Sequence, residues 1–330
     1  MEFGKGDWKT YDRGIQKEWL LANGIGGFAS STIIGANTRR YHGLLVAALK
    51  PPVKRHLVLS KIDESMAIGD RQYNLYSYRT PGYTMKGFHH LQRFTADPVP
   101  TFLFNIGDVY IEKRVCMIYG ENTVAIVYRI LNGSENSRLT LTPLINFRDY
   151  HYNNDRSYMN FGTEVHNNTI TVRPSYYDTD IKLYCSHGYF ERVDDCYFMG
   201  MEYDIEKERG LCSTEDHYIP GFIIVDVQPN EEKVITVVAT VESELTVTDG
   251  YAVIRAEEER LNKLVEKSGL KGGLARSLAR AADAYIVHRQ STEAKTIIAG
   301  YPWFTDWGRD TMIALSGLTL VTRRFDDARE

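Results

Sequence analysis

The feature that most constrains the fold is a long succession of short β-branched runs between residues 44 and 241. The runs alternate partly between apolar and polar positions, and turn-forming segments such as NGSEN and QPNEE separate them. No helical pattern alternates with these runs, so a parallel sheet with crossover helices is not expected. The spacing instead predicts a large antiparallel β-sandwich. The runs are HLVLSKI, TFLFNI, VYIEKRVCMIY, TVAIVYRIL, SRLTLTPLI, TITVRP, GFIIVDV and KVITVVATV.

The pattern becomes helical near Asp249. Val253, Leu261 and Val265 recur with charged residues between them, and Gly269 with the following KGG turn ends the periodicity. We therefore predict three parts, namely a β-domain at 1–248, a linker helix at 249–272, and the beginning of an all-α domain at 273–330.

In the last part we expect one helix over LARSLARAADAYIVHRQ and another over TMIALSGLTLVTRR. The second of these is almost wholly apolar, which predicts burial. A fully apolar helix with a single helical partner leaves its surface uncovered, so we expect the natural protein to continue beyond Glu330 or this chain to be a fragment.

Composition restricts the class of protein. The chain has 39 basic and 43 acidic residues and a formal charge of −4, which argues against nucleic-acid binding. No apolar run reaches the roughly 20 residues that span a bilayer, and the N-terminus lacks a signal-peptide pattern. The four cysteines form no C-x-x-C pair and no metal-ligand spacing with histidine. We expect a reduced, cytoplasmic, soluble protein without a metal or cofactor and without a membrane partner.

The glycine-rich segment EWLLANGIGGFASS, at residues 18–31, is the first of three candidate functional segments. It lacks the lysine and the spacing of a phosphate-binding loop. Two interpretations stay open: a tight turn in which glycine supplies positive φ, or a loop that also lines a site.

The second segment is NTRRYHG, which contains Arg39, Arg40, Tyr41 and His42 and runs into the strand LLVAAL. Guanidinium groups donate to sugar hydroxyls and aromatic rings stack on sugars, so these four residues are candidate substrate-binding residues. The alternative is a structural salt bridge at a strand edge, with His42 as a packed, hydrogen-bonding residue. No acid or base role is assigned to His42.

The third segment is WFTDWGRD, directly before the apolar helix. Its candidate substrate-binding residues are Trp303, Asp306, Trp307, Arg309 and Asp310. Arginine and aspartate can each contact two hydroxyls of one sugar ring. The competing interpretation of Asp310 is a helix N-cap before Thr311.

Two charged clusters, at residues 146–151 and at 206–210 with Glu215 and Asp216, are interpreted as solvated turns or as salt bridges at a domain interface. Neither is expected to be catalytic.

Taken together, these segments resemble one family. EWLLANGIGGFASSTIIGANTRRYHGLLVAAL, HHLQRFTADPVPTF, PLINFRDYH and the stretch from Glu206 through EDHYIPGF are similar to the N-terminal domain of archaeal and bacterial glycogen debranching enzymes. GYPWFTDWGRDTMIALSGL resembles the start of their amylo-α-1,6-glucosidase domain.

The resemblance implies a β-supersandwich followed by an (α/α)6 barrel. It also implies hydrolysis of α-1,6-linked branch glucose of glycogen or limit dextrin, by an inverting mechanism with two carboxyl groups. The WGRD motif resembles the WTRD of glucoamylases, in which Arg and Asp hold the terminal glucose, and this role is carried to Arg309 and Asp310. A twelve-helix barrel needs about 200 residues or more, so the general acid and base are expected beyond residue 330.

Two further functions remain in competition with debranching. One is a glucan-binding module without chemistry of its own, and the other is a glucoamylase-like α-glucosidase or a disaccharide phosphorylase. As a geometric hypothesis, Arg39, Arg40, Tyr41 and His42 are predicted to face the barrel mouth and to form a second wall for a branched chain. The alternative is that the two arginines pair with acidic barrel residues and join the domains.

Overall fold

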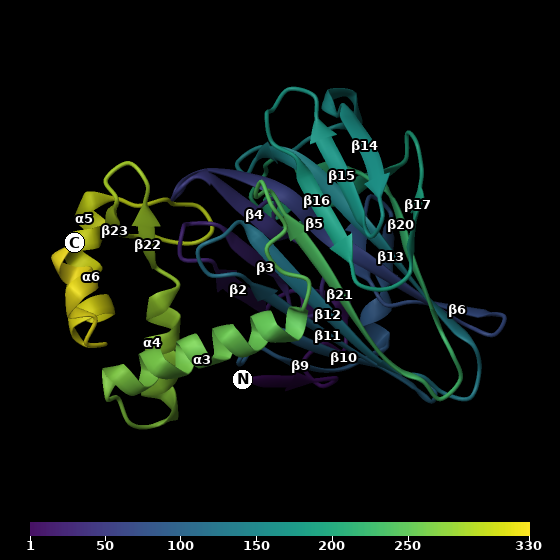
Figure 1. The fold of residues 1–330 in the computed structure, drawn as a ribbon, viewed down its shortest axis with the longest axis horizontal. Coiled ribbons are helices and arrows are strands. Elements are labelled where there is room, and N and C mark those ends of the chain that lie inside the picture. The colour runs from purple at the N-terminus through teal and green to yellow at the C-terminus, as the bar shows by residue number, and fades with distance from the viewer.

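The computed structural model describes residues 1–330, and two large antiparallel sheets form most of it (Figure 1). The first sheet is a nine-stranded sheet that begins with the N-terminal strand at one edge. Its strands, in spatial order, are β1 (Glu2–Gly4), β9 (Leu91–Thr95), β10 (Thr101–Ile106), β11 (Val109–Met117), β12 (Thr123–Leu131), β21 (Glu232–Thr240), β16 (Ile181–Cys185), β15 (Thr169–Pro174) and β14 (Phe161–His166).

The second sheet is ten-stranded, and β5 and β13 form its long centre. Its main path is β17 (Tyr189–Arg192), β20 (Gly221–Val227), β13 (Ser137–Asp149), β5 (Val53–Ile68), β4 (Gly43–Lys50), β3 (Phe28–Thr32) and β2 (Glu18–Ala22). Beside this path lie β6 (Arg71–Asn74), paired with β5, and β19 (Thr214–Tyr218), which pairs with β13 and with β18 (Tyr197–Glu202). Two separate hairpins are β7 (Ser77–Thr80) with β8 (Tyr83–Lys86), and β22 (Ile286–Arg289) with β23 (Ala294–Ile297).

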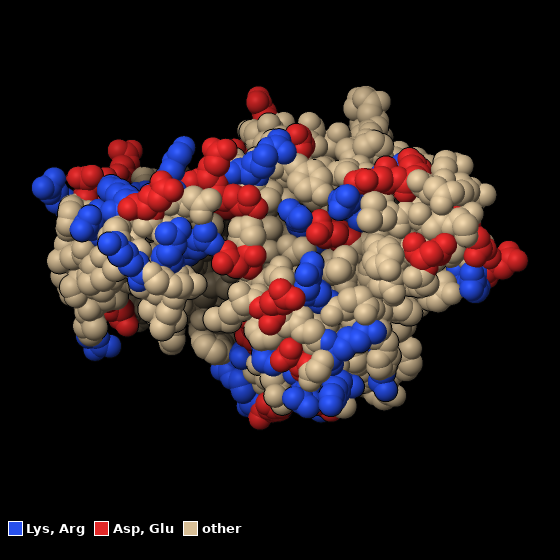
Figure 2. Space-filling model, turned by 90° about the horizontal axis from the view of Figure 1, so that it is seen from below, with Lys and Arg blue, Asp and Glu red and all other residues tan.

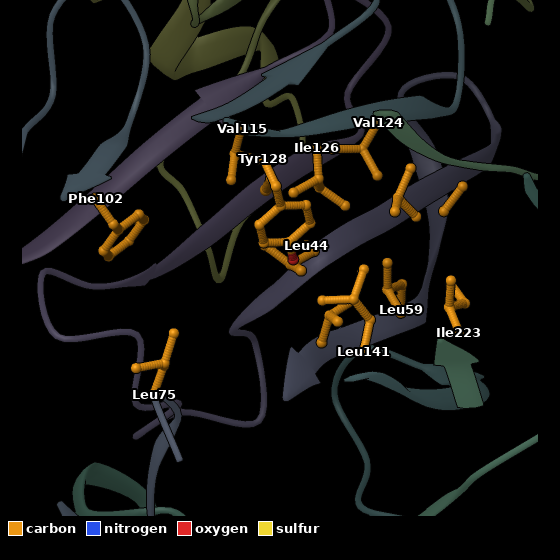
Figure 3. Close-up of a cluster of buried hydrophobic side chains, with 14 of the residues drawn as sticks. Leu44, Leu59, Leu75, Phe102, Val115, Val124, Ile126, Tyr128, Leu141 and Ile223 are labelled. Carbon is orange, nitrogen blue, oxygen red and sulfur yellow. The ribbon is translucent and has the colours of Figure 1, made fainter. Parts of the chain in front are cut away.

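The two sheets share one hydrophobic core of 48 buried residues (Figure 3). Val115, Ile126 and Tyr128 of the first sheet point toward Leu44, Leu59 and Leu141 of the second. Each β-branched run singled out in the sequence contains a strand, and every strand pair is antiparallel. The predicted large antiparallel β-sandwich is therefore confirmed.

The helices lie mainly after the sheets. They are α1 (Tyr11–Gly14), α2 (Asp204–Glu208), α3 (Gly250–Ser268), α4 (Gly273–Asp283), α5 (Gly308–Leu315) and α6 (Phe325–Arg329), with short 3-10 turns η1 (Gly87–His89) and η2 (Arg156–Tyr158) and a π-helical turn η3 (Ser316–Leu320). The helix predicted to follow the sheets is present as α3. The Asp249 carboxylate caps its first turn, and Gly269 ends it with a φ of 66°. Val253 and Ile254 pack on the outer face of the first sheet.

The prediction of one helix over residues 274–290 is wrong in its second half. Helix α4 ends at Asp283, and Ile286 pairs with Ile297 in the β22–β23 hairpin. Ile286 and Val287 are buried, and the His288 N–H donates to the Gly24 carbonyl at 2.8 Å. Burial of these β-branched residues and their pairing in the hairpin override the local helical pattern.

The predicted burial of the apolar third helix is also wrong. No residue of α5 is buried, and Met312 and Ile313 are 70% and 75% exposed. Helix α5 lies with α6 at the outer edge of the molecule (Figure 1), where it contacts β23 and η3. The helix predicted to begin in FDDARE is α6.

No helix of this structure combines the length and apolar character needed to cross a membrane. On the face drawn in Figure 2, basic and acidic side chains are interspersed, and a hollow separates the helical part from the sandwich. The charge on this face therefore forms no extended region of one sign.

The two charged clusters, interpreted as solvated turns or as salt bridges at a domain interface, contain ion pairs with buried carboxylates. The Arg148 guanidinium on β13 donates to both carboxylate oxygens of Glu215, at 2.5 and 2.8 Å, and both side chains are buried. Tyr203 also donates to Glu215, and burial lowers the pKa of the adjacent His217 to about 4, which keeps its imidazole neutral. The pKa of Glu215 lies below its ordinary value because Arg148 outweighs the effect of burial. Sequence spacing shows these charges but not the sheet pairing that encloses them.

We predict that Arg148→Leu lowers the free energy of unfolding by about 3–5 kcal/mol, because Glu215 would remain buried without its cation. Urea denaturation at pH 7 measures the change. Arg138→Leu is the matched control on the same strand, since its ion pair with Asp226 is half exposed and is expected to change stability by about 0–1 kcal/mol. Equal losses in the two variants would contradict the structural role of the buried pair.

Candidate functional site at the junction of sandwich and helical segment

The structure brings together the NTRRYHG segment and the loop that begins WFTDWGRD. The Arg39 guanidinium carbon lies 5.2 Å from the centre of the Trp303 ring. The Tyr41 ring packs edge-on against Trp303 with 6.4 Å between ring centres. Two segments more than 260 residues apart along the chain therefore form one surface where the sandwich meets the helical part.

Arg55, at the start of β5, contacts the WFTDWGRD loop from the sandwich side. Its guanidinium is fully buried and lies 5.0–5.7 Å from the ring centres of Phe28, Tyr150 and Tyr301. One Arg55 nitrogen donates to the Phe304 carbonyl at 3.0 Å, while its Nε and Nη2 have no hydrogen-bond partner. Electron-rich ring faces stabilise a desolvated cation, so Arg55 attaches the loop to the sandwich without a carboxylate.

Tyr150 adds a second attachment, because its hydroxyl donates to the Trp303 carbonyl at 3.1 Å. Burial raises the pKa of this phenol above its ordinary value, so the hydroxyl keeps its proton. The loop backbone is thus held at two successive carbonyls, of Trp303 and Phe304.

Glu206 and Arg209 belong to the same surface, in a segment interpreted from the sequence as a solvated turn or as salt bridges at a domain interface. Glu206 is fully buried, and its Oε2 lies 3.5 Å from Arg40 Nε and 3.3 Å from Arg209 Nη1. The guanidinium carbon of Arg209 lies 5.8 Å from the Trp303 ring centre. The backbone N–H of Ile205 donates to the Thr38 carbonyl at 3.0 Å and so fixes α2 against NTRRYHG. No local pattern signals this docking, which depends on the fold of the β18–β19 pair.

Arg40 makes its polar contacts within the sandwich. It donates to the carbonyls of His151 at 2.7 Å and Cys212 at 3.1 Å. Arg39 likewise donates to Glu18 at 2.8 Å. The two arginines therefore pair with acidic residues of the sandwich, Glu18 and Glu206, and not with acidic residues of the helical part, as the joining alternative required.

Tyr41 and His42 are buried, at 6% and 1% exposure, so they do not reach a ligand directly. The Tyr41 hydroxyl and His151 Nδ1 share a hydrogen bond of 3.1 Å. His42 Nδ1 accepts from the Thr38 N–H at 3.0 Å, and its Nε2 lies 3.6 Å from Glu18. The interpretation of His42 as a packed residue is the one that the structure supports.

The ANGIGGFASS segment is a tight turn that packs on neighbouring backbone. Gly24 and Gly26 have φ values of 74° and 93°. A Cβ on Gly24 would lie 2.4 Å from the Tyr119 ring, and one on Gly26 would lie 2.6 Å from Pro52. Glycine is required at both positions because of φ and space. The turn also accepts the hydrogen bond from His288, so it supports the β22–β23 hairpin.

Asp306 is engaged within the chain. Its carboxylate accepts two hydrogen bonds from Arg289, at 2.7 and 2.6 Å, and one from Thr296 at 3.0 Å. Because three donors already occupy its oxygens, Asp306 joins the WFTDWGRD loop to the β22–β23 hairpin.

The third segment also contains Trp307, Arg309 and Asp310, whose side chains are not engaged by other residues of the chain. Trp307 and Arg309 are exposed, and the side chains of Arg309 and Asp310 form no hydrogen bond or ion pair in the structure. Helix α5 begins at Gly308 with Trp307 at the N-cap position, so the N-cap interpretation of Asp310 is wrong. Asp310 lies in the first turn, where a carboxylate interacts favourably with the helix dipole.

Two family models match the chain, one over the sandwich and one over the helical segment. A family model described as glycogen debranching enzyme N terminal matches residues 17–234, and a model described as amylo-alpha-1,6-glucosidase matches residues 280–330. No curated protein matches the chain.

Two solved structures resemble the fold at low identity. A putative kojibiose phosphorylase from the human microbiome shares 11% identity with a TM-score of 0.46, over 86% of this chain and 41% of its own. A bacterial glucoamylase complexed with acarbose shares 14% identity with a TM-score of 0.48, over 96% of this chain and 47% of its own. The chain thus spans less than half the length of either protein.

The two family matches define a chain with the domain order of glycogen debranching enzymes, an N-terminal domain followed by residues that match an amylo-alpha-1,6-glucosidase domain. More specifically, the chain belongs to the family defined by the N-terminal domain of glycogen debranching enzymes. The surface around Trp303 joins the two matched regions.

The ionised carboxylate of Glu18 stabilises this surface, and its contribution depends on pH. Burial would raise the pKa of its carboxyl, but the adjacent His42 and Arg39 side chains lower it to about 2. A carboxyl with a lowered folded-state pKa stabilises the fold above its ordinary value of 4.5, and this contribution is lost as the pH falls toward 2.

We therefore predict that Glu18→Gln destabilises the protein more at pH 7 than at pH 3. Denaturant unfolding at several pH values measures the difference in free energy of unfolding between variant and wild type. Glu2→Gln, at a 64% exposed side chain, serves as the control and should show no such difference. If the difference in free energy of unfolding between Glu18→Gln and wild type were the same at pH 7 and pH 3, stabilisation of the Glu18 carboxylate by Arg39 and His42 would be ruled out.

Proposed function

We propose that the full-length protein hydrolyses α-1,6-linked branch glucose of glycogen or limit dextrin. The family matches support this substrate class. The observation that carries the proposal is the contact of Arg39 and Arg209, from the first matched region, with Trp303 of the second. A pocket for one terminal glucose can be made by loops of a helical domain alone, whereas a branched chain needs a second wall. The sandwich supplies that wall through these arginines.

In this proposal the residues have distinct roles. Arg309 and Asp310 hold the terminal glucose, since both side chains are free of internal partners, and Trp307 presents an exposed ring face beside them. Arg39 and Arg209 shape the wall with Trp303, and Arg40 lies beside them through its ion pair with Glu206. Tyr41 and His42 support these arginines from inside the sandwich.

We propose further that residues 273–330 begin an (α/α)6 barrel and that hydrolysis proceeds with inversion. Inversion uses two carboxyl groups about 6.5–9.5 Å apart, one as general acid and one as general base for a water molecule. We assign neither role to a residue of this chain, which by itself is expected to bind glucan without turnover.

The first test is glucose release from a phosphorylase limit dextrin by the full-length protein. We expect free glucose from this substrate, and Asp310→Ser should reduce kcat/KM at least about a hundredfold, because the clamp strengthens in the transition state. The melting temperature should stay close to that of wild type, since Asp310 is not a cap. Release of glucose only from linear α-1,4 chains would identify a glucoamylase instead, and wild-type kinetics of Asp310→Ser would exclude the clamp.

The second test distinguishes two roles of Arg39, namely binding of the branched substrate and structural contact between the sandwich and the helical segment. Arg39→Ala is expected to raise KM for branched dextrin by roughly tenfold, a loss of about 1.4 kcal/mol of binding, with little effect on a small α-1,6-linked disaccharide. Arg129→Ala, which removes a half-exposed ion pair with Glu232 on the first sheet, is the matched control. If Arg39→Ala left the ratio of kcat/KM for the two substrates unchanged and lowered only the melting temperature, the role of Arg39 would be structural.

A further inference from the structure

The three most exposed tyrosines of the chain lie in the segments that precede and follow the β14–β15 hairpin. Tyr176, Tyr158 and Tyr152 are 79%, 77% and 69% exposed. Four further tyrosines of the sandwich, Tyr83, Tyr110, Tyr177 and Tyr189, are less exposed, at 54%, 46%, 42% and 53%. Single exposed apolar side chains are ordinary, but a group of them on one region marks a contact surface.

Backbone pairing places these tyrosines at one end of the sandwich. Tyr158 ends η2, two residues before Asn160, whose carbonyl accepts from the Ser175 N–H at 3.0 Å. Tyr176 is the next residue after Ser175, so Tyr158 and Tyr176 leave the same open end of the β14–β15 hairpin. In Figure 1 this end of β14 and β15 lies at the top of the sandwich.

Tyr152 connects this group with the candidate site. It directly follows His151, which contacts Tyr41 and Arg40, and its N–H donates to the Asp149 carbonyl at 3.2 Å in the turn after β13. Tyr177, beside Tyr176, packs against Phe147 and His56 at 4.7 and 5.6 Å between ring centres. His56 is in turn adjacent to Arg55 on β5. Tyr152 is therefore adjacent to His151, a residue of the junction. Tyr176 is adjacent to Tyr177, whose ring packs against the sandwich.

We infer that Tyr152, Tyr158 and Tyr176 form a binding platform for a linear α-glucan segment, apart from the site that holds the terminal glucose. The C–H face of a pyranose is apolar and its rim is polar, which suits an exposed tyrosine with an apolar ring and a terminal hydroxyl. The ligand is an outer α-1,4-linked chain of the same branched polymer. This inference rests on the proposed function for its substrate class, and it adds a second contact that increases the effective concentration of substrate at the site.

The test measures binding and needs no turnover. The 330-residue chain is run through native gels with and without glycogen, and retardation by glycogen gives an apparent affinity. The triple variant Tyr152→Ala, Tyr158→Ala, Tyr176→Ala is expected to weaken this affinity by about tenfold, which corresponds to about 1.4 kcal/mol. Its melting temperature should not change, because all three side chains are exposed.

The matched control is the triple variant Tyr83→Ala, Tyr110→Ala, Tyr189→Ala. These tyrosines are 54%, 46% and 53% exposed and lie on β8, β11 and β17. The control should retain the wild-type affinity. Equal retardation of wild type and both triple variants, or an equal loss in both variants, would overturn the platform. A change in the oligomeric state of the first variant in the absence of glycogen would assign the tyrosines to a protein contact and would also overturn it.

Hydrolysis by the full-length protein separates this result from the proposed function. In the first triple variant, KM for glycogen should rise while kcat/KM for a small α-1,6-linked disaccharide stays unchanged. Loss of glycogen binding with intact debranching of small substrates supports the platform. Debranching by wild type with no effect of the three substitutions on KM for glycogen would reject the platform and leave the proposed function standing.

Discussion

The junction between the sandwich and the helical segment depends on one buried cation, Arg55. A guanidinium that is removed from water without a carboxylate is costly, and this one is met by the faces of Phe28, Tyr150 and Tyr301 and by one carbonyl of the WFTDWGRD loop. Two of those groups come from the loop and its flank, so the cation is stabilised only when the loop is docked. The position of Trp303 therefore follows from the charge on β5, and the surface formed with Arg39 and Arg209 follows from the position of Trp303.

A second set of buried charges supports the other side of the same surface. Arg148 and Glu215 fix the end of β13 to β19, and Arg148 also donates to the Arg40 carbonyl at 2.8 Å. Glu206, on α2, lies close to both Arg40 and Arg209. The arginines that face the loop are thus positioned by buried carboxylates and carbonyls of the sandwich itself. The surface gains rigidity from these pairs, while the chain as a whole carries a formal charge of only −4.

The sequence was informative where one local pattern determines the structure. Alternating β-branched runs identified eight strands of the two sheets, and the sequence around Asp249 and Gly269 identified α3, because caps and periodicity are local properties. It was misleading at residues 286–290 and 311–324, where tertiary contacts, or their absence, decided the outcome. Among the candidate site residues, the structure leaves Arg309 and Asp310 free, engages Asp306 with Arg289, and buries Tyr41 and His42. Glu206 and Arg209 were missed because a run of charges looks solvated until a partner strand covers it.

The sequence by itself determined the fold class, the family and the residue types available for sugar contact, since strand periodicity and long motifs are written in neighbouring positions. Only the tertiary structure decided which of those residues meet. Arg39 and Trp303 are distant in sequence and come together through pairing of β4 with β5 and docking of the loop on Arg55. Tyr152, Tyr158 and Tyr176 are likewise ordinary tyrosines in the sequence, and they become one exposed group because the β14–β15 hairpin opens beside the end of β13. Side-chain exposure and long-range contact depend on the packing of the whole chain, and no local pattern encodes them.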